Sequence, residues 1–238
     1  MEGSVDPPWQ LSTTTYHRVT ATFVEITLEC GAVGWGECLV REAAGATRAI
    51  VDDVLAPILI GKDARRVQSL WDEMYKLFRT RGHSRGIVLE AIAGVDIALW
   101  DALGRAFGRS IADLLMMDAR PTIDCYASSI MVTNEDSTAR EAARLLDEGY
   151  RAVKIKVGQG PKLDARRVHL VREIVGDDVQ LMVDVNCNYD LTEAIAFVGL
   201  VAEANISWLE EPVMPDDLPG LSKVGEDVPD HFTCRRRI

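Results

Sequence analysis

The feature that most constrains the fold is a series of three short apolar segments, each ending in a charged residue and separated from the next by helix-like sequence. The charged ends are Lys156, Asp184 and Glu210, at intervals of about 28 and about 26 residues. The stretches between them, residues 161–175 and 192–204, carry apolar residues at helical spacing. Each interval is the length of one strand–helix unit in an eight-stranded barrel of about 250 residues. The sequence therefore predicts consecutive units of a (β/α)8 barrel.

The segment Ala-Val-Lys-Ile-Lys-Val-Gly at residues 152–158 places two lysines on one face of a predicted strand. Side chains alternate along a strand, so Lys154 and Lys156 point one way while the apolar residues point the other. Two ammonium groups on one wall repel each other, which predicts that the pKa of at least one lysine falls towards neutrality. Such an amine is a candidate general base. The alternative interpretation is a solvated face of an edge strand.

Two carboxylates stand where the next two strands are expected to end. Asp184 closes the apolar run 179–183, and Glu210 closes the run 206–209. In parallel barrels the carboxyl ends of the strands line the active site, and hard oxygen ligands suit Mg²⁺. A lysine facing two such ligands is suited to Mg²⁺-assisted removal of a proton next to a carboxylate. Taken singly, Asp184 has the open alternative of a helix cap or turn residue, and Glu210 that of an acidic strand exit.

The same motifs resemble a known enzyme family. Lys-Ile-Lys at 154–156, Val-Asp-Val-Asn at 183–186 and Trp-Leu-Glu-Glu-Pro at 208–212 are similar in wording and spacing to the mandelate racemase and muconate lactonizing enzyme family of the enolase superfamily. Gly-Trp-Gly-Glu at 34–37 resembles a strand of that family's cap domain, and residues 93–101 resemble its helix leading into the barrel. The resemblance implies an α+β cap domain followed by an incomplete (β/α)8 TIM-type barrel, with about four of the barrel strands present.

The resemblance also implies roles for the charged residues. It makes Lys156 the general base, and Lys154 the neighbour that lowers the pKa of Lys156 and touches the substrate carboxylate. Asp184 and Glu210 are the implied ligands of Mg²⁺. The resemblance implies no other cofactor.

Two polar residues that follow the implied ligands complete the expected site. By the resemblance, Asn186 binds metal-site water or substrate, and Glu211 supports the metal ligands. The implied reaction is Mg²⁺-dependent removal of the proton α to a carboxylate through a stabilised enediolate. The substrate is a small-molecule carboxylate such as an acid sugar, and the first expectation is an acid-sugar dehydratase. The alternative is a racemase, epimerase or cycloisomerase of the same family, and the full-length form is expected to be a homo-oligomer.

The chain is expected to contain two domains. Residues 1–120 form the predicted α+β capping domain, and residues 121–238 form the first half of the barrel. The cap is expected to begin with an antiparallel meander over residues 18–39. Its predicted helices lie at residues 43–55, 64–79 and 86–105. The barrel is expected to open with a strand at residues 122–127, followed by a helix at residues 135–148.

Parts of the family pattern are not recognised in this sequence. Family members need a third metal carboxylate on the fifth barrel strand and a second acid or base on a later strand. Neither is found, and the first strand of the cap is also expected to be missing. We therefore expect a C-terminally truncated chain. The second class of function is an inactive truncated remnant, which keeps the motifs without completing the site.

The C-terminal residues 231–238 are unlike a buried barrel strand, because they include three consecutive arginines. Back-translated with permitted codons and read one base later, they give Ile-Ser-Pro-Ala-Gly-Gly-Glu. That peptide resembles the family's fifth strand with its third metal ligand, and the new Glu would follow Glu210 by about one strand–helix unit. Our hypothesis is a single-base frameshift shortly before His231, which leaves residues 231–238 out of frame.

Composition excludes several classes of partner. The chain carries 37 acidic against 26 basic residues, a net charge of -11, which argues against nucleic acid as a partner. No apolar run approaches the roughly 18 residues of a spanning helix, and the N-terminus lacks a signal-peptide pattern, so no membrane association is expected. We expect a cytoplasmic protein. Its five cysteines are odd in number and lack paired spacing, which predicts free thiols.

Overall fold

The chain forms two compact units in a computed structural model that describes residues 2–11, 13–40, 43–116, 118–228 and 233–235. The first, here called the cap unit, comprises Met1–Val5 and Arg18–Thr122. The second, the barrel unit, comprises Asp6–His17 and Ile123–Ile238. Each unit has its own buried cluster of apolar side chains, so each is described by itself.

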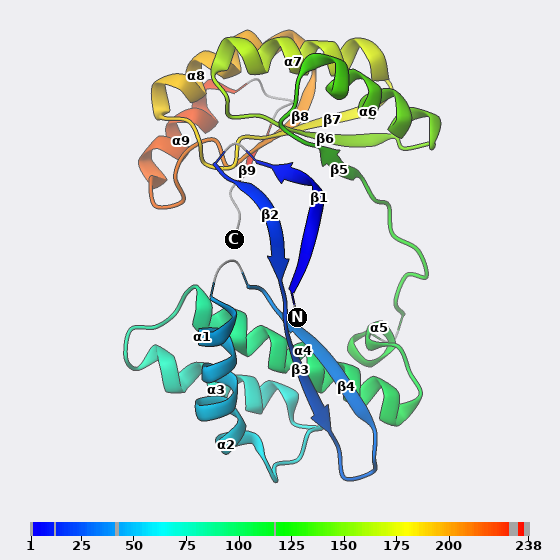
Figure 1. The fold of residues 1–238 in the computed structure, drawn as a ribbon, viewed down its shortest axis with the longest axis vertical. Coiled ribbons are helices and arrows are strands. Elements are labelled where there is room, and N and C mark those ends of the chain that lie inside the picture. The colour runs from blue at the N-terminus through cyan, green and yellow to red at the C-terminus, as the bar shows by residue number, and fades with distance from the viewer. Residues whose placement is uncertain (1, 12, 41–42, 117, 229–232, 236–238) are drawn as a thin grey trace. The chain divides into compact units, whose positions relative to one another are not determined.

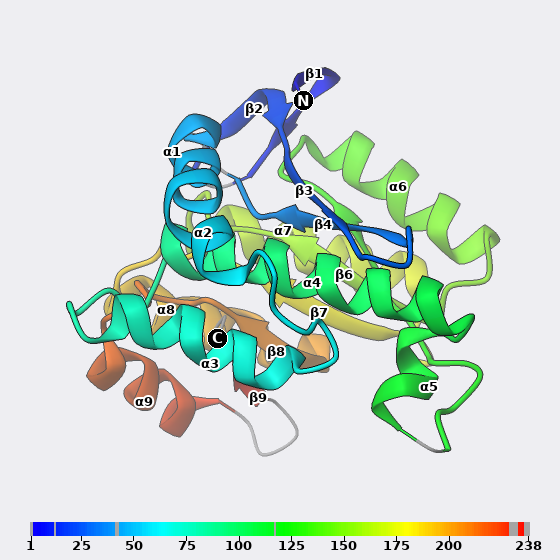
Figure 2. The same ribbon diagram turned by 90° about the horizontal axis from the view of Figure 1, so that it is seen from below.

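Short antiparallel strand pairs and helices make up the first half of the chain (Figure 1). The elements are β1 (Glu2–Gln10), β2 (Thr15–Thr20), β3 (Thr22–Thr27), β4 (Val33–Cys38), α1 (Ala44–Ala49), the π-helix η1 (Ile50–Leu55), α2 (Ala56–Leu59), α3 (Val67–Arg79), α4 (Ile87–Phe107) and α5 (Ile111–Leu115). Strand β1 pairs with β2, and β3 pairs with β4 around a turn at Gly31, whose φ of 86° is easily adopted by glycine. Helical segments α1, η1 and α2 follow one another in a continuous coil (Figure 2).

Glycines allow β4 to lie directly on the backbone of α4. A Cβ atom on Gly34 would stand 2.2 Å from the backbone nitrogen of Ala102, and one on Gly36 would stand 2.0 Å from the carbonyl oxygen of Gly94. No other residue fits at such distances without a shift of the helix. The Gly-Trp-Gly-Glu pattern therefore reflects packing inside the cap unit.

The barrel unit is built from alternating strands and helices. Its elements are β5 (Ala127–Ile130), α6 (Glu135–Asp147), β6 (Ala152–Lys156), α7 (Pro161–Val175), β7 (Gln180–Asp184), α8 (Leu191–Leu200), the 3-10 helix η2 (Ala202–Ala204), β8 (Ile206–Glu210), α9 (Leu218–Asp227) and β9 (Thr233–Arg235). The strands form one parallel sheet in the order β5-β6-β7-β8-β9. Helices α6, α7 and α8 cover one face of this sheet (Figure 1).

The sheet buries its helix-covered face in a core of branched aliphatic side chains. Val153 and Ile155 of β6, Leu181 and Val183 of β7 and Leu209 of β8 are fully buried there. Because side chains alternate along a strand, the residues between them point to the opposite face. That alternation brings the lysines of β6 to the face away from the helices.

The structure confirms an α+β cap followed by part of a parallel (β/α)8 barrel. The predicted first barrel strand at residues 122–127 is wrong in position, because β5 begins at Ala127. Ile123 is 80% exposed, whereas Ala127 and Ile130 are buried and pair with β6. Five parallel strands are described where about four were predicted, since Thr233–Arg235 adds β9 beside β8.

Near the N-terminus the structure differs from the sequence-based expectation, and at the C-terminus most of the residues in question lie outside the described part. Strand β1 precedes the predicted meander and was not indicated by the sequence pattern. Residues 231, 232 and 236–238 lie outside the described residues, so the frameshift hypothesis stays a prediction.

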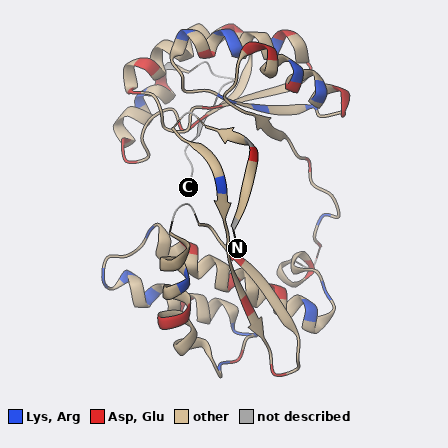
Figure 3. Ribbon diagram, in the orientation of Figure 1, with Lys and Arg blue, Asp and Glu red and all other residues tan. Residues whose placement is uncertain are grey.

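Several predicted properties of the chain can be compared with the described residues. Among the described residues, Cys30, Cys38, Cys125 and Cys187 are not joined in disulfide bonds, as predicted, and the side chain of Cys234 lies outside the described part. Within the same residues, no helix has the length and apolar character needed to cross a membrane. Acidic and basic residues are mixed along the helices of the barrel unit (Figure 3).

Candidate active site

The two lysines of β6 share one face of the sheet, as the alternation predicted. Val153 and Ile155 face the helices and are fully buried, while Lys154 and Lys156 face the other way. The side chain of Lys154 is 7% exposed and that of Lys156 is 14% exposed. Neither lysine lies on a solvated strand face, so that alternative is wrong.

Strand register brings the two carboxylates beside the lysines. Lys156 is the pairing partner of Asp184 in the β6–β7 ladder, and Asp184 is the partner of Glu210 in the β7–β8 ladder. All three residues are the last of their strands. The sequence-predicted base and metal ligands therefore lie side by side at the carboxyl edge of the sheet.

Each lysine pairs with a carboxylate across the sheet. Lys156 Nζ lies 2.5 Å from Asp184 Oδ2, and Lys154 Nζ lies 2.6 Å from Glu210 Oε2. Lys154 Nζ is also 3.5 Å from Asp184 Oδ2. The carboxylate of Asp184 is only 1% exposed, so these charges are satisfied by one another more than by water.

The prediction that the pKa of at least one of the two lysines falls is not met at Lys154. Burial lowers the pKa of Lys154, but its hydrogen bond to Glu210 and the charges of Asp184 and Glu210 act in the opposite direction and raise the pKa above its usual value. The predicted fall in pKa is therefore not found at Lys154. The reason is that carboxylates lie closer to this ammonium group than the repulsion argument from one strand could show.

Asn186 and Glu211 lie in the turns that follow the two carboxylates. Both have a left-handed backbone, with φ of 53° and 48°. The backbone N–H of Asn186 donates to Asp184 Oδ1 over 2.9 Å, and its side-chain amide donates to Glu211 Oε2 over 3.3 Å. The side-chain carbonyl oxygen of Asn186 is buried and has no hydrogen-bond partner among the described residues. An acceptor oxygen thus remains available beside the carboxylates.

The donor atoms suit a hard divalent cation. Asp184 and Glu210 present carboxylate oxygens on neighbouring strands, and the unpartnered oxygen of Asn186 lies in the adjoining turn. Mg²⁺ prefers oxygen ligands and is commonly held by one or two protein carboxylates with water. Among the described residues, no group of three or more His, Cys, Asp or Glu side chains is arranged to hold a metal. The residues present therefore fit part of a Mg²⁺ coordination shell.

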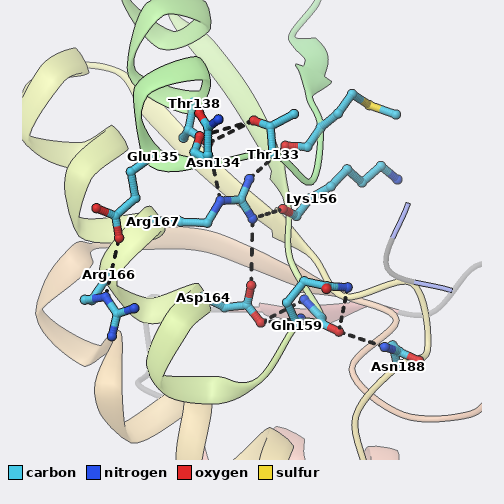
Figure 4. A network of polar contacts seen from close by, with 12 residues as sticks. Thr133, Asn134, Glu135, Thr138, Lys156, Gln159, Asp164, Arg166, Arg167 and Asn188 are labelled. Atoms are coloured by element: carbon cyan, nitrogen blue, oxygen red, sulfur yellow. Dashed lines mark hydrogen bonds and ion pairs between the residues drawn. The ribbon is translucent and has the colours of Figure 1, made fainter. Parts of the chain in front are cut away.

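A buried polar network behind the site was missed by the sequence reasoning. Asp164 and Arg167 of α7 are 0% and 2% exposed (Figure 4). Tyr189, in the loop after β7, is 4% exposed. The available signal was an Asp in the first turn of the helix and an Arg three residues later, both on the helix face that also carries the buried valines.

Two family models match the chain. The model described as the mandelate racemase / muconate lactonizing enzyme, N-terminal domain, matches residues 2–116. The model described as enolase C-terminal domain-like matches residues 137–230. The matches fall largely within the cap unit and the barrel unit, respectively.

Known proteins resemble the chain over most of its length. It is 37% identical over 235 residues to the D-galactarolactone cycloisomerase of Agrobacterium fabrum, covering 96% of this chain and 61% of that protein. It is 30% identical over 216 residues to the arabinonate dehydratase of Saccharolobus solfataricus, covering 89% of this chain and 57% of that protein. A racemase from Streptomyces coelicolor A3(2), solved with bound magnesium, matches with a TM-score of 0.82 at 32% identity, covering 89% of this chain and 64% of that one.

The chain therefore spans from 57% to 64% of the length of these relatives. The similarity includes both units, and the fold agrees with it from the cap to the parallel sheet. By sequence and by structure, this chain belongs to the mandelate racemase/muconate lactonizing enzyme family of the enolase superfamily.

Proposed function

We propose that the carboxyl edge of the barrel sheet removes the proton α to a carboxylate in a small acid-sugar substrate, with dehydration as the overall reaction. The observation that carries the proposal is the row formed by Lys156, Asp184 and Glu210 at three successive strand ends. The amine of Lys156 stands there beside two carboxylates, whose hard oxygen atoms suit Mg²⁺. The proposal is supported by relatives that include an acid-sugar dehydratase.

Lys156 is the proposed base. It is the last residue of β6, and its side chain is slightly more exposed than that of Lys154. To act as a base it must release its proton and its ion pair with Asp184. Lys154, held by Glu210, keeps a positive charge beside the reacting centre and is proposed to orient the substrate carboxylate.

Asp184 and Glu210 are the proposed Mg²⁺ ligands, with Asn186 binding metal-site water or substrate. When bound, Mg²⁺ would supply positive charge that stabilises negative charge developing on the substrate. Glu211 accepts the side-chain amide of Asn186 and so holds that residue's free oxygen in a fixed direction. Asp184 further restrains the turn by accepting the backbone N–H of Asn186.

A second candidate reaction is supported by the comparisons. The relative that is 37% identical to this chain is a cycloisomerase, and another relative is a racemase. Both kinds of reaction can begin with the same removal of an α-proton. The first step is therefore common to the candidates, and a test of that step does not depend on which product is formed.

The experiment measures exchange of the α-proton with solvent. The purified chain is incubated in D2O with Mg²⁺ and a panel of aldonic acids, aldaric acids and their lactones, and loss of the α-proton signal is followed by NMR. We expect exchange by the wild-type chain, no exchange after removal of Mg²⁺ with a chelator, and a loss of roughly 10²- to 10⁴-fold in Lys156→Ala.

A matched control separates the role of Lys156 from a general loss of positive charge. Lys162 is an exposed lysine on α7, so Lys162→Ala should exchange at the wild-type rate. Wild-type exchange in Lys156→Ala would contradict the assignment of the base. No exchange by the wild-type chain with any member of the panel would favour the inactive remnant.

A further inference from the structure

One buried guanidinium holds the ends of two barrel strands. Arg167 Nη1 donates to the carbonyl oxygen of Lys156 over 2.9 Å, and Nη2 donates to the carbonyl oxygen of Met131 over 2.7 Å (Figure 4). Its Nε atom donates to Thr138 Oγ1 over 3.3 Å. Met131 directly follows β5 and Lys156 ends β6. A rigid fork of donors therefore sets the spacing of the two strand ends.

The carboxylate of Asp164, which pairs with Arg167, holds the loops that follow β6 and β7. Asp164 Oδ2 accepts the backbone N–H groups of Gly158 and Gln159 over 3.0 and 2.7 Å, and the hydroxyl of Tyr189 over 2.6 Å. Its Oδ1 atom lies 3.7 Å from Arg167 Nη1. Gly158 and Gln159 follow Lys156, and Tyr189 lies in the loop after β7. The pair thus joins both loops through a single helix turn of α7.

A contribution to folding stability does not by itself explain why Asp164 and Arg167 form a buried ion pair. Removing two charges from water is costly, so a buried ion pair often contributes little to folding. The contacts of this pair are concentrated on the main chain at the carboxyl ends of the strands, where the candidate site lies. Burial and the hydrogen bond to Asp164 raise the pKa of Tyr189, which keeps its hydroxyl a donor.

We propose that Arg167 is a positioning residue for Lys156, holding the carbonyl group of that lysine so that its side chain keeps its place beside Asp184. The proposal rests on the proposed role of Lys156, since positioning matters only if this amine takes part in the reaction. Lys154 lies two residues earlier on the same strand, and no hydrogen bond from Arg167 to its backbone is among the contacts of the described residues. Substitution of Arg167 should therefore loosen the side chain of Lys156 and leave that of Lys154 in place.

The experiment compares the two lysines in one molecule without requiring turnover. The full chain is labelled with ¹⁵N-lysine, and the ammonium signals of Lys154 and Lys156 are assigned by their loss in Lys154→Arg and Lys156→Arg. In Arg167→Met, exchange of the Lys156 ammonium protons with water should be roughly tenfold or more faster, because its ion pair opens more often. The exchange rate of the Lys154 ammonium protons should change by less than about twofold.

Neighbouring residues provide the controls. Arg166 is an adjacent, exposed arginine whose ion pair is with Glu135, so Arg166→Met should leave both lysine signals unchanged. Arg167→Lys should restore the Lys156 rate in part, because one donor can still reach a carbonyl oxygen. A double variant, Arg167→Met with Asp164→Asn, removes both buried charges and should show the same selective effect.

The outcomes are decisive in both directions. Selective acceleration at Lys156 supports the proposal. Equal changes at Lys154 and Lys156, no change at either, or failure of both Met-containing variants to fold would overturn it, since Arg167 would then serve the fold and not the placement of Lys156. This result is independent of the proton-exchange test of the proposed function, so each proposal fails by its own measurement.

Discussion

At the scale of single residues, the candidate site is organised by charge pairs between strands. Asp184 Oδ2 forms ion pairs with Lys156 Nζ at 2.5 Å and with Lys154 Nζ at 3.5 Å. Glu210 also forms an ion pair with Lys154. These lysines neutralise the carboxylates in the structure. A metal held by Asp184 and Glu210, as proposed above, would compete with Lys156 for the oxygens of Asp184 and so would favour release of the proposed base.

Asp184 is expected to stabilise the metal-free fold. In Asp184→Ala, Lys154 and Lys156 lose a shared buried partner, and the free energy of unfolding should fall by about 3 kcal/mol. Urea unfolding in the presence of a chelator measures this change. The control is Asp52→Ala, whose exposed pair with Arg48 should contribute close to nothing. Equal unfolding midpoints for wild type and Asp184→Ala would show that the lysines are solvated and not paired.

Tyr189 makes stability depend on alkaline pH. Burial of the ring, and next its hydrogen bond to Asp164, raise the pKa of the phenol above the ordinary value of 10.0. Above that pH the unfolded chain loses a proton that the folded chain keeps, so the stabilisation is present below it and is lost as pH rises. From about pH 10 to about pH 11, the free energy of unfolding should fall about 1 kcal/mol more in wild type than in Tyr189→Phe. Parallel pH profiles from urea unfolding would contradict this.

At the scale of secondary-structure elements, glycine placement decides how closely β4 approaches α4. The carbonyl oxygen of Gly94 lies where a Cβ atom on Gly36 would stand, so the strand cannot keep its position with any side chain there. Trp35, between the two glycines of β4, faces away and is about half exposed. One strand thus uses its alternation to give backbone contact on one face and a large side chain on the other.

Two glycine-to-alanine substitutions in the cap unit should change the free energy of unfolding in opposite directions. Gly36→Ala should lower the free energy of unfolding by about 3 kcal/mol, because the new methyl group overlaps helix backbone. Gly45→Ala, in α1 with no atom within 4 Å of the new Cβ, should raise it by up to about 1 kcal/mol. Thermal or urea unfolding measures both variants. Destabilisation of similar size in both would show that the tight contact is not the cause.

At the scale of the whole molecule, the buried apolar residues separate into two clusters with no member in common. One cluster includes Met74 in the cap unit, and the other includes Phe197 in the barrel unit. Both side chains are fully buried. Separate cores make each unit a cooperative region whose stability depends mainly on its own packing.

Substituting a large core side chain by alanine should therefore lower the stability of only the unit that contains it. Met74→Ala and Phe197→Ala each leave a cavity, and each should destabilise its unit by about 3 kcal/mol. Hydrogen exchange followed by mass spectrometry should show faster exchange in the helices of the cap unit for Met74→Ala and in those of the barrel unit for Phe197→Ala. Acceleration in both units by either variant would show that the two cores unfold as one.

The sequence alone was enough to predict the strand–helix alternation of the barrel unit, because hydrophobic periodicity and helix caps are local properties. The helix expected at residues 135–148 is observed as Glu135–Asp147, capped by Asn134. Alternation also placed Lys154 and Lys156 on one face, and regular spacing placed Asp184 and Glu210 at strand ends. These predictions need only the period of a strand and the length of a repeating unit.

Tertiary structure decided which groups meet. The partners of Lys154 come from two other strands, so its raised pKa could not be derived from the charges on its own strand. The start of β5 depends on pairing with β6, which local sequence does not specify. Arg167 lies 11 residues from Lys156 and 36 from Met131 along the chain, yet holds both carbonyl oxygens. Contacts of this kind arise only when the strands and helices have packed, because electrostatics and hydrogen bonding depend on distance in space and not along the chain.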